Sequence, residues 1–376
     1  MNDFEIRNRY FDRLVNTPGL RWMGQNTNHH PLPDAVRQAM IDCIAADEFR
    51  IYAPPLGFED LRSAIVADIG LPEAVAMVTD GGVEALYHVC HTFLAAGDRF
   101  VTTDPGWKWP PSFARAIGAE VVEIPIYDPV RNYRLAAAQL EEVADGRMKV
   151  IYLVDPNNPL GTCIAADEMK DIAQIARRHD AIIIHDCTYR HFAEGHTLAA
   201  NFYPEGTLTI YSFSKWLGLA GLRIGAVLGV PDLIARLAAA PPNNLGSNVI
   251  SQRAAMAGLE VKDSWFPDVQ RVQRRNQQKI KTAAEELGLH VPVYPSNGNF
   301  LVVECIQAGI QPEALVAAMQ EHNIMIRQGV YHTPRFGDRF IKVSTSVPEL
   351  WADEFCARLP EAVQHARTRP AAMKLF

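Results

Sequence analysis

The sequence has no long uncharged apolar run and no excess of basic residues. A membrane-spanning helix needs about 20 consecutive apolar residues, and the 376-residue chain contains no uncharged run of that kind. Its net charge is -7, whereas a nucleic-acid-binding surface needs a basic face. We therefore expect neither a membrane span nor a nucleic-acid partner.

Closely spaced cysteines are also absent. The six cysteines stand singly along the chain: Cys43, Cys90, Cys163, Cys187, Cys305 and Cys356. This spacing fits neither a disulfide framework nor a metal site, so we expect no metal and a reducing compartment. The first residues, MNDFEIRNRYFDRL, are charged throughout and lack the apolar core of a signal peptide. These features predict a cytoplasmic protein.

The middle of the chain alternates short apolar segments with segments of helical periodicity. The predicted strands are Arg99–Thr103, Lys149–Val154, Ala181–His185, Thr207–Tyr211 and Arg223–Leu228. Apolar residues recur at helical spacing between them: Leu86, Val89, Cys90 and Phe93, then Met169, Ile172, Ala173 and Ala176. Such alternation predicts an α/β fold with a mostly parallel sheet between two helical layers.

The remainder of the chain has a different composition, and its length favours two domains. The change falls at Pro241-Pro242-Asn243-Asn244, before a charged helix predicted over about Val261–Leu287. Two further strands, Asn299–Glu304 and Arg339–Ser344, flank a helix that starts near Pro312. We predict a large domain over residues 48–242 and a smaller α+β domain formed by residues 1–47 and 243–376.

Polar and aromatic residues follow four of the predicted strands, at the edge where ligands bind to open parallel sheets. They are Trp107, Asn158, Asp186, and the group Ser212, Ser214 and Lys215. Each residue alone has a structural interpretation, such as a helix cap, a turn or a core side chain. Together, and in this order, they predict a functional site.

Four motifs resemble the fold-type-I pyridoxal-phosphate (PLP) enzymes, specifically the class I/II aminotransferases. The motifs are SFSKWLGLAGLRIG (Ser212–Gly225), DPNNPLG (Asp155–Gly161), HDCTYRHF (His185–Phe192) and YAPPLGFEDLR (Tyr52–Arg62). The resemblance runs from about Asn26 to Ser344. Two further segments, GQNTNHHPLP (Gly24–Pro33) and NGNF (Asn297–Phe300), are similar to the histidinol-phosphate aminotransferase-like branch.

The resemblance implies a role for each polar residue around the cofactor ring. Lys215 would hold PLP as a Schiff base and then act as general base. Asp186 would pair with the pyridine nitrogen and keep it protonated. Tyr189 and Asn158 would donate hydrogen bonds to the ring's phenolic oxygen, and Trp107 would stack on the ring.

The cofactor phosphate needs its own binding groups. We assign to it the backbone N–H groups of Gly82 and Val83, because a helix begins there and a helix N-terminus suits an anion. The hydroxyls of Ser212 and Ser214 and the guanidinium of Arg223 complete the predicted set, since arginine matches phosphate oxygens bidentately.

One tyrosine predicts the oligomeric state. In the resembled family, the residue equivalent to Tyr52 reaches the phosphate of the neighbouring subunit. The resemblance therefore implies a homodimer with shared active sites.

The predicted substrate site departs from the family pattern. Lys342 stands where the family typically has an arginine that binds the substrate carboxylate, and a lysine cannot form the same planar pair of bonds. Arg327 and Arg339 are candidate substitutes, and Asn26 is a further candidate for substrate contact. The most favoured substrates are an amino acid and a 2-oxo acid.

Several alternatives remain open from the sequence. The same residues could serve a PLP-dependent decarboxylase, a lyase, an amino-acid oxidase or hydroxylase, or a non-catalytic ligand-binding relative. A nicotinamide-dependent enzyme is disfavoured, because Gly218, Gly221 and Gly225 do not form GxGxxG.

Overall fold

The computed structural model describes residues 3–239, 241, 243 and 245–368. Its largest sheet has seven strands in the order β2-β8-β7-β6-β5-β3-β4. All are parallel except β8, which runs antiparallel to both neighbours. The strands are β2 (Val75–Thr79), β3 (Arg99–Asp104), β4 (Glu120–Pro125), β5 (Met148–Val154), β6 (Ile182–Asp186), β7 (Thr207–Ser212) and β8 (Gly225–Gly229).

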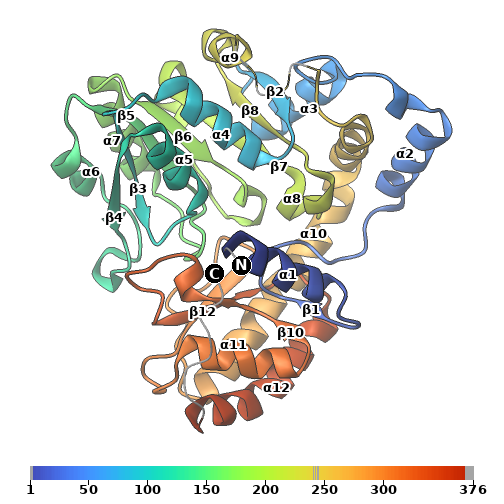
Figure 1. Ribbon diagram of the computed structural model, residues 1–376, viewed down its shortest axis with the longest axis vertical. Helices are drawn as coiled ribbons and strands as arrows, with labels where there is room; N and C mark the ends of the chain where they lie inside the picture. The colour runs from blue at the N-terminus through green and yellow to red at the C-terminus, as the bar shows by residue number, and fades with distance from the viewer. Residues whose placement is uncertain (1–2, 240, 242, 244, 369–376) are drawn as a thin grey trace.

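Helices cover both faces of this sheet (Figure 1). One face packs against α4 (Gly82–Phe93), α5 (Trp109–Ile117) and α9 (Pro231–Ala238). The other face packs against α6 (Ala137–Val143) and α7 (Ala166–Arg178), and further along the sheet against α3 (Glu59–Ile69). Strand alternation explains this arrangement: Met77 faces the first layer, while Ala76 and Val78 face α3. The predicted three-layer α/β fold is confirmed.

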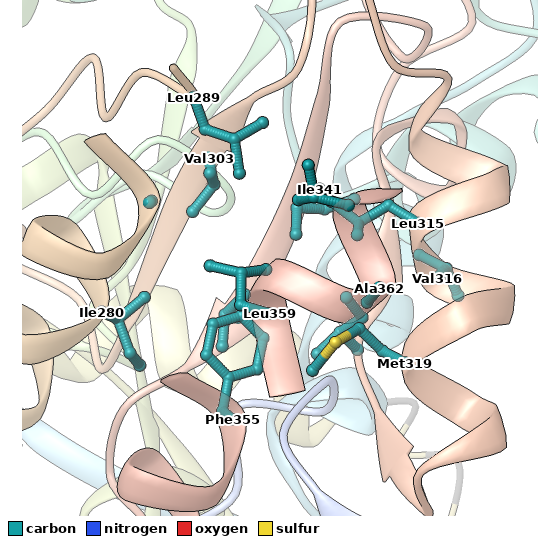
Figure 2. Close-up of a cluster of buried hydrophobic side chains, with 14 of the residues drawn as sticks. Ile280, Leu289, Val303, Leu315, Val316, Met319, Ile341, Phe355, Leu359 and Ala362 are labelled. Carbon is teal, nitrogen blue, oxygen red and sulfur yellow. The ribbon is translucent and has the colours of Figure 1, made fainter. Parts of the chain in front are cut away.

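A second, antiparallel sheet has the order β11-β12-β9. Its strands are β9 (Phe300–Glu304), β11 (Arg327–Gln328) and β12 (Phe340–Ser344), and it packs against α11 (Pro312–Glu321) and α12 (Glu349–Thr368). Figure 2 shows the shared core, in which Val303 and Ile341 from the sheet face Leu315 of α11 and Phe355 of α12. Beside it, β1 (Arg21–Trp22) pairs with β10 (Ile324–Met325).

The long helix α10 (Val249–Glu286) connects the two sheets (Figure 1). It contacts α2 (Asp34–Ala45) and α3 at one end and α12 at the other. The sequence predicted only Val261–Leu287, because the preceding segment is too apolar and alanine-rich to match the charged pattern. Pro242 and Asn244 of the predicted junction lie outside the described residues.

Two further helices lie near the start of the chain and after β7. They are α1 (Asp3–Val15) and α8 (Phe213–Trp216). Helix α1 buries Tyr10 and Leu14 against Leu20 and Met325, so it is attached beside the β1–β10 pair. None of the helices in the described part of the chain combines the length and hydropathy that a membrane crossing requires.

Phe355 tests the core around the second sheet. Its ring is fully buried, so Phe355→Ala should lower the free energy of unfolding by about 3–5 kcal/mol through lost burial and a cavity. Urea unfolding followed by tryptophan fluorescence measures the change. The control is Leu350→Ala on the same helix, where the side chain is 62% exposed and the expected change is within about 0.5 kcal/mol. Equal losses in the two variants would contradict the packing described above.

Candidate active site

A cavity of about 270 Å³ lies at the carboxyl ends of β5, β6 and β7 and extends to the second sheet. Nearly all of the predicted site residues line it: Asn26, Gly82, Val83, Trp107, Asn158, Asp186, Tyr189, Ser212, Ser214, Lys215, Arg223, Arg327 and Lys342. They come from segments more than 300 residues apart. Tyr52 and Arg339 are not among the lining residues.

Asp186 is the last residue of β6 and is buried. Its Oδ1 accepts hydrogen bonds from the Thr188 hydroxyl at 2.6 Å and the Thr188 N–H at 3.2 Å. Its Oδ2 accepts one from the Tyr152 hydroxyl at 2.9 Å. Burial raises the pKa of Asp186, and these bonds oppose the rise because they stabilise the ionised form.

Lys215 lies in the short helix α8, directly after β7. Ser212 caps this helix, because its Oγ accepts a hydrogen bond from the Ser214 N–H at 3.2 Å. The Lys215 Nζ donates to the backbone oxygen of Gln25 at 3.0 Å. Burial, helped by the charge of Arg223, lowers the pKa of Lys215 to about 8. The amine is therefore closer to its neutral, nucleophilic form than an exposed lysine.

Three buried polar side chains meet beside this amine. The Asn26 Nδ2 donates to the Tyr189 hydroxyl at 3.1 Å and to Asn158 Oδ1 at 3.4 Å. The Asn26 N–H donates to the Ser344 hydroxyl at 2.8 Å, which joins this cluster to β12 of the second sheet. The cluster holds Tyr189 and Asn158 on the same wall of the cavity.

The start of α4 forms another wall. Helix α4 begins at Gly82, after Gly81 with φ of 85°. A Cβ on Gly81 would lie 2.2 Å from Nη2 of Arg223, so only glycine leaves room for the guanidinium. Arg223 Nη1 donates to the Ala220 oxygen at 2.9 Å, which orients the fork beside the helix start.

Two basic side chains of the second sheet face the same cavity. Arg327 of β11 and Lys342 of β12 are directly opposite each other in the antiparallel register, and both are buried. Lys342 Nζ donates to Asn158 Oδ1 at 3.4 Å, and the Arg327 guanidinium lies 4.5 Å from the centre of the Tyr331 ring. Burial and the charge of Arg327 lower the pKa of Lys342 well below its ordinary value.

Trp107 and Tyr52 differ in their distance from the cavity. Trp107 is half-buried and lines the cavity, with its ring 6.2 Å from that of Tyr331. Tyr52 is 78% exposed and borders a separate surface hollow with Phe49, Ile51 and Leu245. Within one chain, therefore, Tyr52 is not part of the cavity.

Sequence reasoning missed several residues at the site. Thr188 and Tyr331 line the cavity, Gln25 contributes its backbone oxygen, and Tyr152 contacts Asp186 from beneath. Thr188 could have been found, because it lies inside the Asp186–Tyr189 motif. Tyr152 looks like an ordinary strand residue in the sequence.

Behind Asp186, a buried network fixes the turn after β5. Cys187, His185 and His196 offer possible metal-ligand atoms within 4.8 Å of one another. However, both ring nitrogens of His185 already have protein partners. Its Nδ1 accepts the Ala199 N–H at 3.2 Å, so the proton of the ring lies on Nε2 and faces Asp155 at 3.4 Å. His196 Nε2 lies 3.1 Å from the same carboxylate. Burial alone would raise the pKa of Asp155, but the bonds to His185 and His196 outweigh it and lower this pKa to about 2.

Comparison with known proteins relates this geometry to one family. The family model "Aminotransferase class I and II" matches residues 19–359. The chain is 28% identical over 345 residues to histidinol-phosphate aminotransferase 1 of Mesorhizobium japonicum, covering 89% of each protein. It is 26% identical over 298 residues to aspartate/prephenate aminotransferase of Thermus thermophilus, covering 76% of each.

Solved structures share the fold. N-succinyldiaminopimelate aminotransferase from Mycobacterium tuberculosis superposes with a TM-score of 0.85 at 24% identity, over 94% of this chain and 96% of that one. Aspartate aminotransferase from Thermus thermophilus with maleate gives 0.83 at 22% identity, over 96% of both chains. With the family match over most of its length, the chain belongs to the class I and II aminotransferases and is a transaminase that uses pyridoxal phosphate.

Proposed function

We propose that Lys215 and Asp186 are the catalytic centre of this transaminase and that Lys215 holds the cofactor covalently. One observation carries the proposal: the amine of Lys215 and the carboxylate of Asp186, from two neighbouring strand ends, line one cavity. An amine and an acid facing one enclosed volume can hold the two ends of a cofactor ring.

The groups around the cavity fit the cofactor. The start of α4 offers the N–H groups of Gly82 and Val83 to an anion, and the hydroxyls of Ser212 and Ser214 lie on the same wall. The space above Gly81 that a Cβ would fill is taken by the Arg223 guanidinium. This cationic and N–H-rich donor set suits a phosphate, so we assign these residues to the cofactor phosphate.

The remaining residues would orient the ring and move a proton. When bound, PLP supplies an electron sink for a carbanion at the substrate Cα. Lys215, once released by the substrate amine, would take the Cα proton on its Nζ and return it to the cofactor side. Asp186 would hold the proton of the pyridine nitrogen. Tyr189 and Asn158 would donate to the phenolic oxygen, and Trp107 would lie against the ring face.

The substrate carboxylate is proposed to bind Arg327, with Lys342 beside it. Like charges directly opposite in a sheet destabilise it, yet this pair is buried and faces the cavity. Asp186 is the single acid among the described residues that line the cavity. An anionic substrate group would compensate the charge of Arg327 and favour the protonated form of Lys342, and Arg327 can form two parallel bonds to it. Asn26, which also lines the cavity, would be a further contact for the substrate.

A second copy of the chain is proposed to complete the site. Tyr52 is exposed, and apolar side chains that are also exposed surround it, including Phe49, Ile51 and Leu245. Exposed apolar groups of this kind mark protein contact surfaces. We propose a two-fold homodimer in which Tyr52 reaches the cofactor phosphate of the partner's site.

We also propose the division of the chain into two domains and the cellular compartment of the protein. The seven-stranded and three-stranded sheets support two domains, proposed as residues 48–242 and residues 1–47 with 243–376. Across these bounds, Val36 of α2 and the first half of α10 pack in the core beside α3 of the large sheet. All six cysteines are unpaired, which supports a reducing compartment and hence a cytoplasmic location.

Lys215→Ala tests the covalent link. After reconstitution with PLP, the unaltered protein should have a visible absorption band that borohydride abolishes, with cofactor and Lys215 joined in one peptide by mass spectrometry. Lys215→Ala should lose the labelled peptide and at least about a thousandfold in turnover, because both the link and the general base are gone. Lys281→Ala, which removes a surface lysine paired with Glu285, is the control. A labelled peptide elsewhere in the chain would reject the assignment.

Arg327→Lys tests the substrate carboxylate. Losing the bidentate pair should raise KM for the amino donor about ten- to a hundredfold, with a smaller change in kcat. The spectral change of the bound cofactor on adding amino acids measures this in single turnover. Arg339→Lys serves as the matched control, because Arg339 is exposed and outside the cavity lining. If Arg339→Lys has the larger effect, Arg339 binds the carboxylate instead.

Mixing two inactive variants tests the dimer. A Tyr52→Ala protein lacks the phosphate contact made across the interface, and a Lys215→Ala protein lacks the amine. Each mixed dimer has one site with both residues intact, so mixing should restore up to about a quarter of the native activity, the statistical share for two exchanging subunits. Sedimentation equilibrium checks the mass. A monomer that is fully active would contradict the shared site.

A further inference from the structure

Tyr152 lies beneath the cavity and contacts Asp186. It is on β5, its side chain is fully buried, and its hydroxyl donates to Asp186 Oδ2 at 2.9 Å. A buried tyrosine hydroxyl needs a partner, and here the partner is a carboxylate rather than a backbone carbonyl. No motif in the sequence points to this residue.

Sheet geometry fixes the contact. In the parallel register of β5 and β6, Tyr152 is opposite Ile184, and Val154 is opposite Asp186. Because side chains alternate along a strand, these four residues face the same side of the sheet. The phenol therefore extends along the sheet toward the strand ends and reaches the carboxylate from below.

Two neighbours on β3 fix Tyr152, one through its ring and one through its backbone. Phe100 of β3 stacks on it with ring centres 6.1 Å apart and an interplanar angle of 30°. The Thr102 hydroxyl donates to the Tyr152 backbone oxygen at 3.0 Å. With its ring and backbone fixed, Tyr152 presents its hydroxyl in one direction only.

The hydrogen bonds that Asp186 accepts are shared between the two oxygens of its carboxylate. Thr188 supplies both donors to Oδ1, while Tyr152 supplies the donor to Oδ2. An ionised carboxylate has about four acceptor positions, so these three donors leave one for a further partner, and Asp186 lines the cavity. The burial and the nearby anion raise the pKa of Tyr152 well above its ordinary value, so it remains a donor at any working pH.

We propose that Tyr152 is a positioning residue that keeps the Asp186 carboxylate ionised and aimed at the pyridine nitrogen, and so keeps that nitrogen protonated. The inference rests on the proposed role of Asp186. Without the phenol, the buried carboxylate has one donor fewer to stabilise its charge. The shared proton then moves from the ring nitrogen toward the carboxylate, and the cofactor becomes a poorer electron sink.

Nitrogen NMR of protein reconstituted with PLP labelled with ¹⁵N in the ring tests this directly. The native protein should have the resonance of a protonated ring, and Tyr152→Phe should move it toward the unprotonated position. Val150→Ala, which removes another fully buried side chain of β5 but leaves the phenol and its contact with Phe100, should leave the resonance unmoved. An unmoved resonance in Tyr152→Phe, or an equal shift in Val150→Ala, would overturn the inference.

Asp186→Asn separates this inference from the proposed function. If Asp186→Asn shifts the resonance but Tyr152→Phe does not, only the role of Tyr152 is wrong. If the native ring is unprotonated, or Asp186→Asn leaves the resonance in place, the proposed role of Asp186 itself is wrong.

Cofactor affinity gives a second, independent measurement. Tyr152→Phe should weaken PLP binding to the cofactor-free protein about three- to tenfold, as coupled hydrogen-bonded groups do. A PLP analogue with carbon in place of the ring nitrogen cannot pair with Asp186, so its affinity should be the same in both proteins. Equal weakening for PLP and the analogue would mean that Tyr152 acts only through packing and would overturn the inference.

Discussion

The buried carboxylate of Asp186 and the partly buried amine of Lys215, which line one cavity, are the constraint on which this site depends. Burying an ionised group is costly unless hydrogen bonds or an opposite charge compensate it. Asp186 receives three donors from Thr188 and Tyr152, and Lys215 is bonded to the Gln25 backbone. The parallel pairing of β6 with β7 brings these two residues to one edge of the sheet. The rest of the cavity wall serves to keep this pair enclosed and oriented.

The second sheet contributes the opposite side of the cavity and two of the four basic side chains that line it among the described residues. Arg327 and Lys342 are opposed across β11 and β12, an arrangement that sheets ordinarily avoid. Functional sites commonly retain such unfavourable contacts, because the ligand relieves them. The Asn26–Ser344 bond joins this sheet to the cluster around Tyr189. This bond holds the basic side chains of the second sheet and the polar cluster around Tyr189 in fixed relative positions.

Residues behind the cavity fix the positions of the residues that line it. Asp155 binds His185 and His196 and also accepts the Ile164 N–H at 3.0 Å, which fixes the turn that carries Asn158. Tyr152 supports Asp186 in a comparable way from below. A mutation at these positions changes the direction of a functional side chain without removing it, and active sites are sensitive to such small displacements.

The sequence by itself determined the strand–helix alternation, the family motifs and the identity of most cavity residues. Strand ends are readable because apolar runs stop where polar residues begin, and this located Asp186, Asn158 and Lys215. Only the tertiary structure decided which distant segments meet. Arg327 rather than Arg339 faces the cavity because of the β11–β12 register. Tyr152 reaches Asp186 because two parallel strands align at a given offset. Such pairings depend on register and packing between remote segments, and no local pattern in one sequence encodes them.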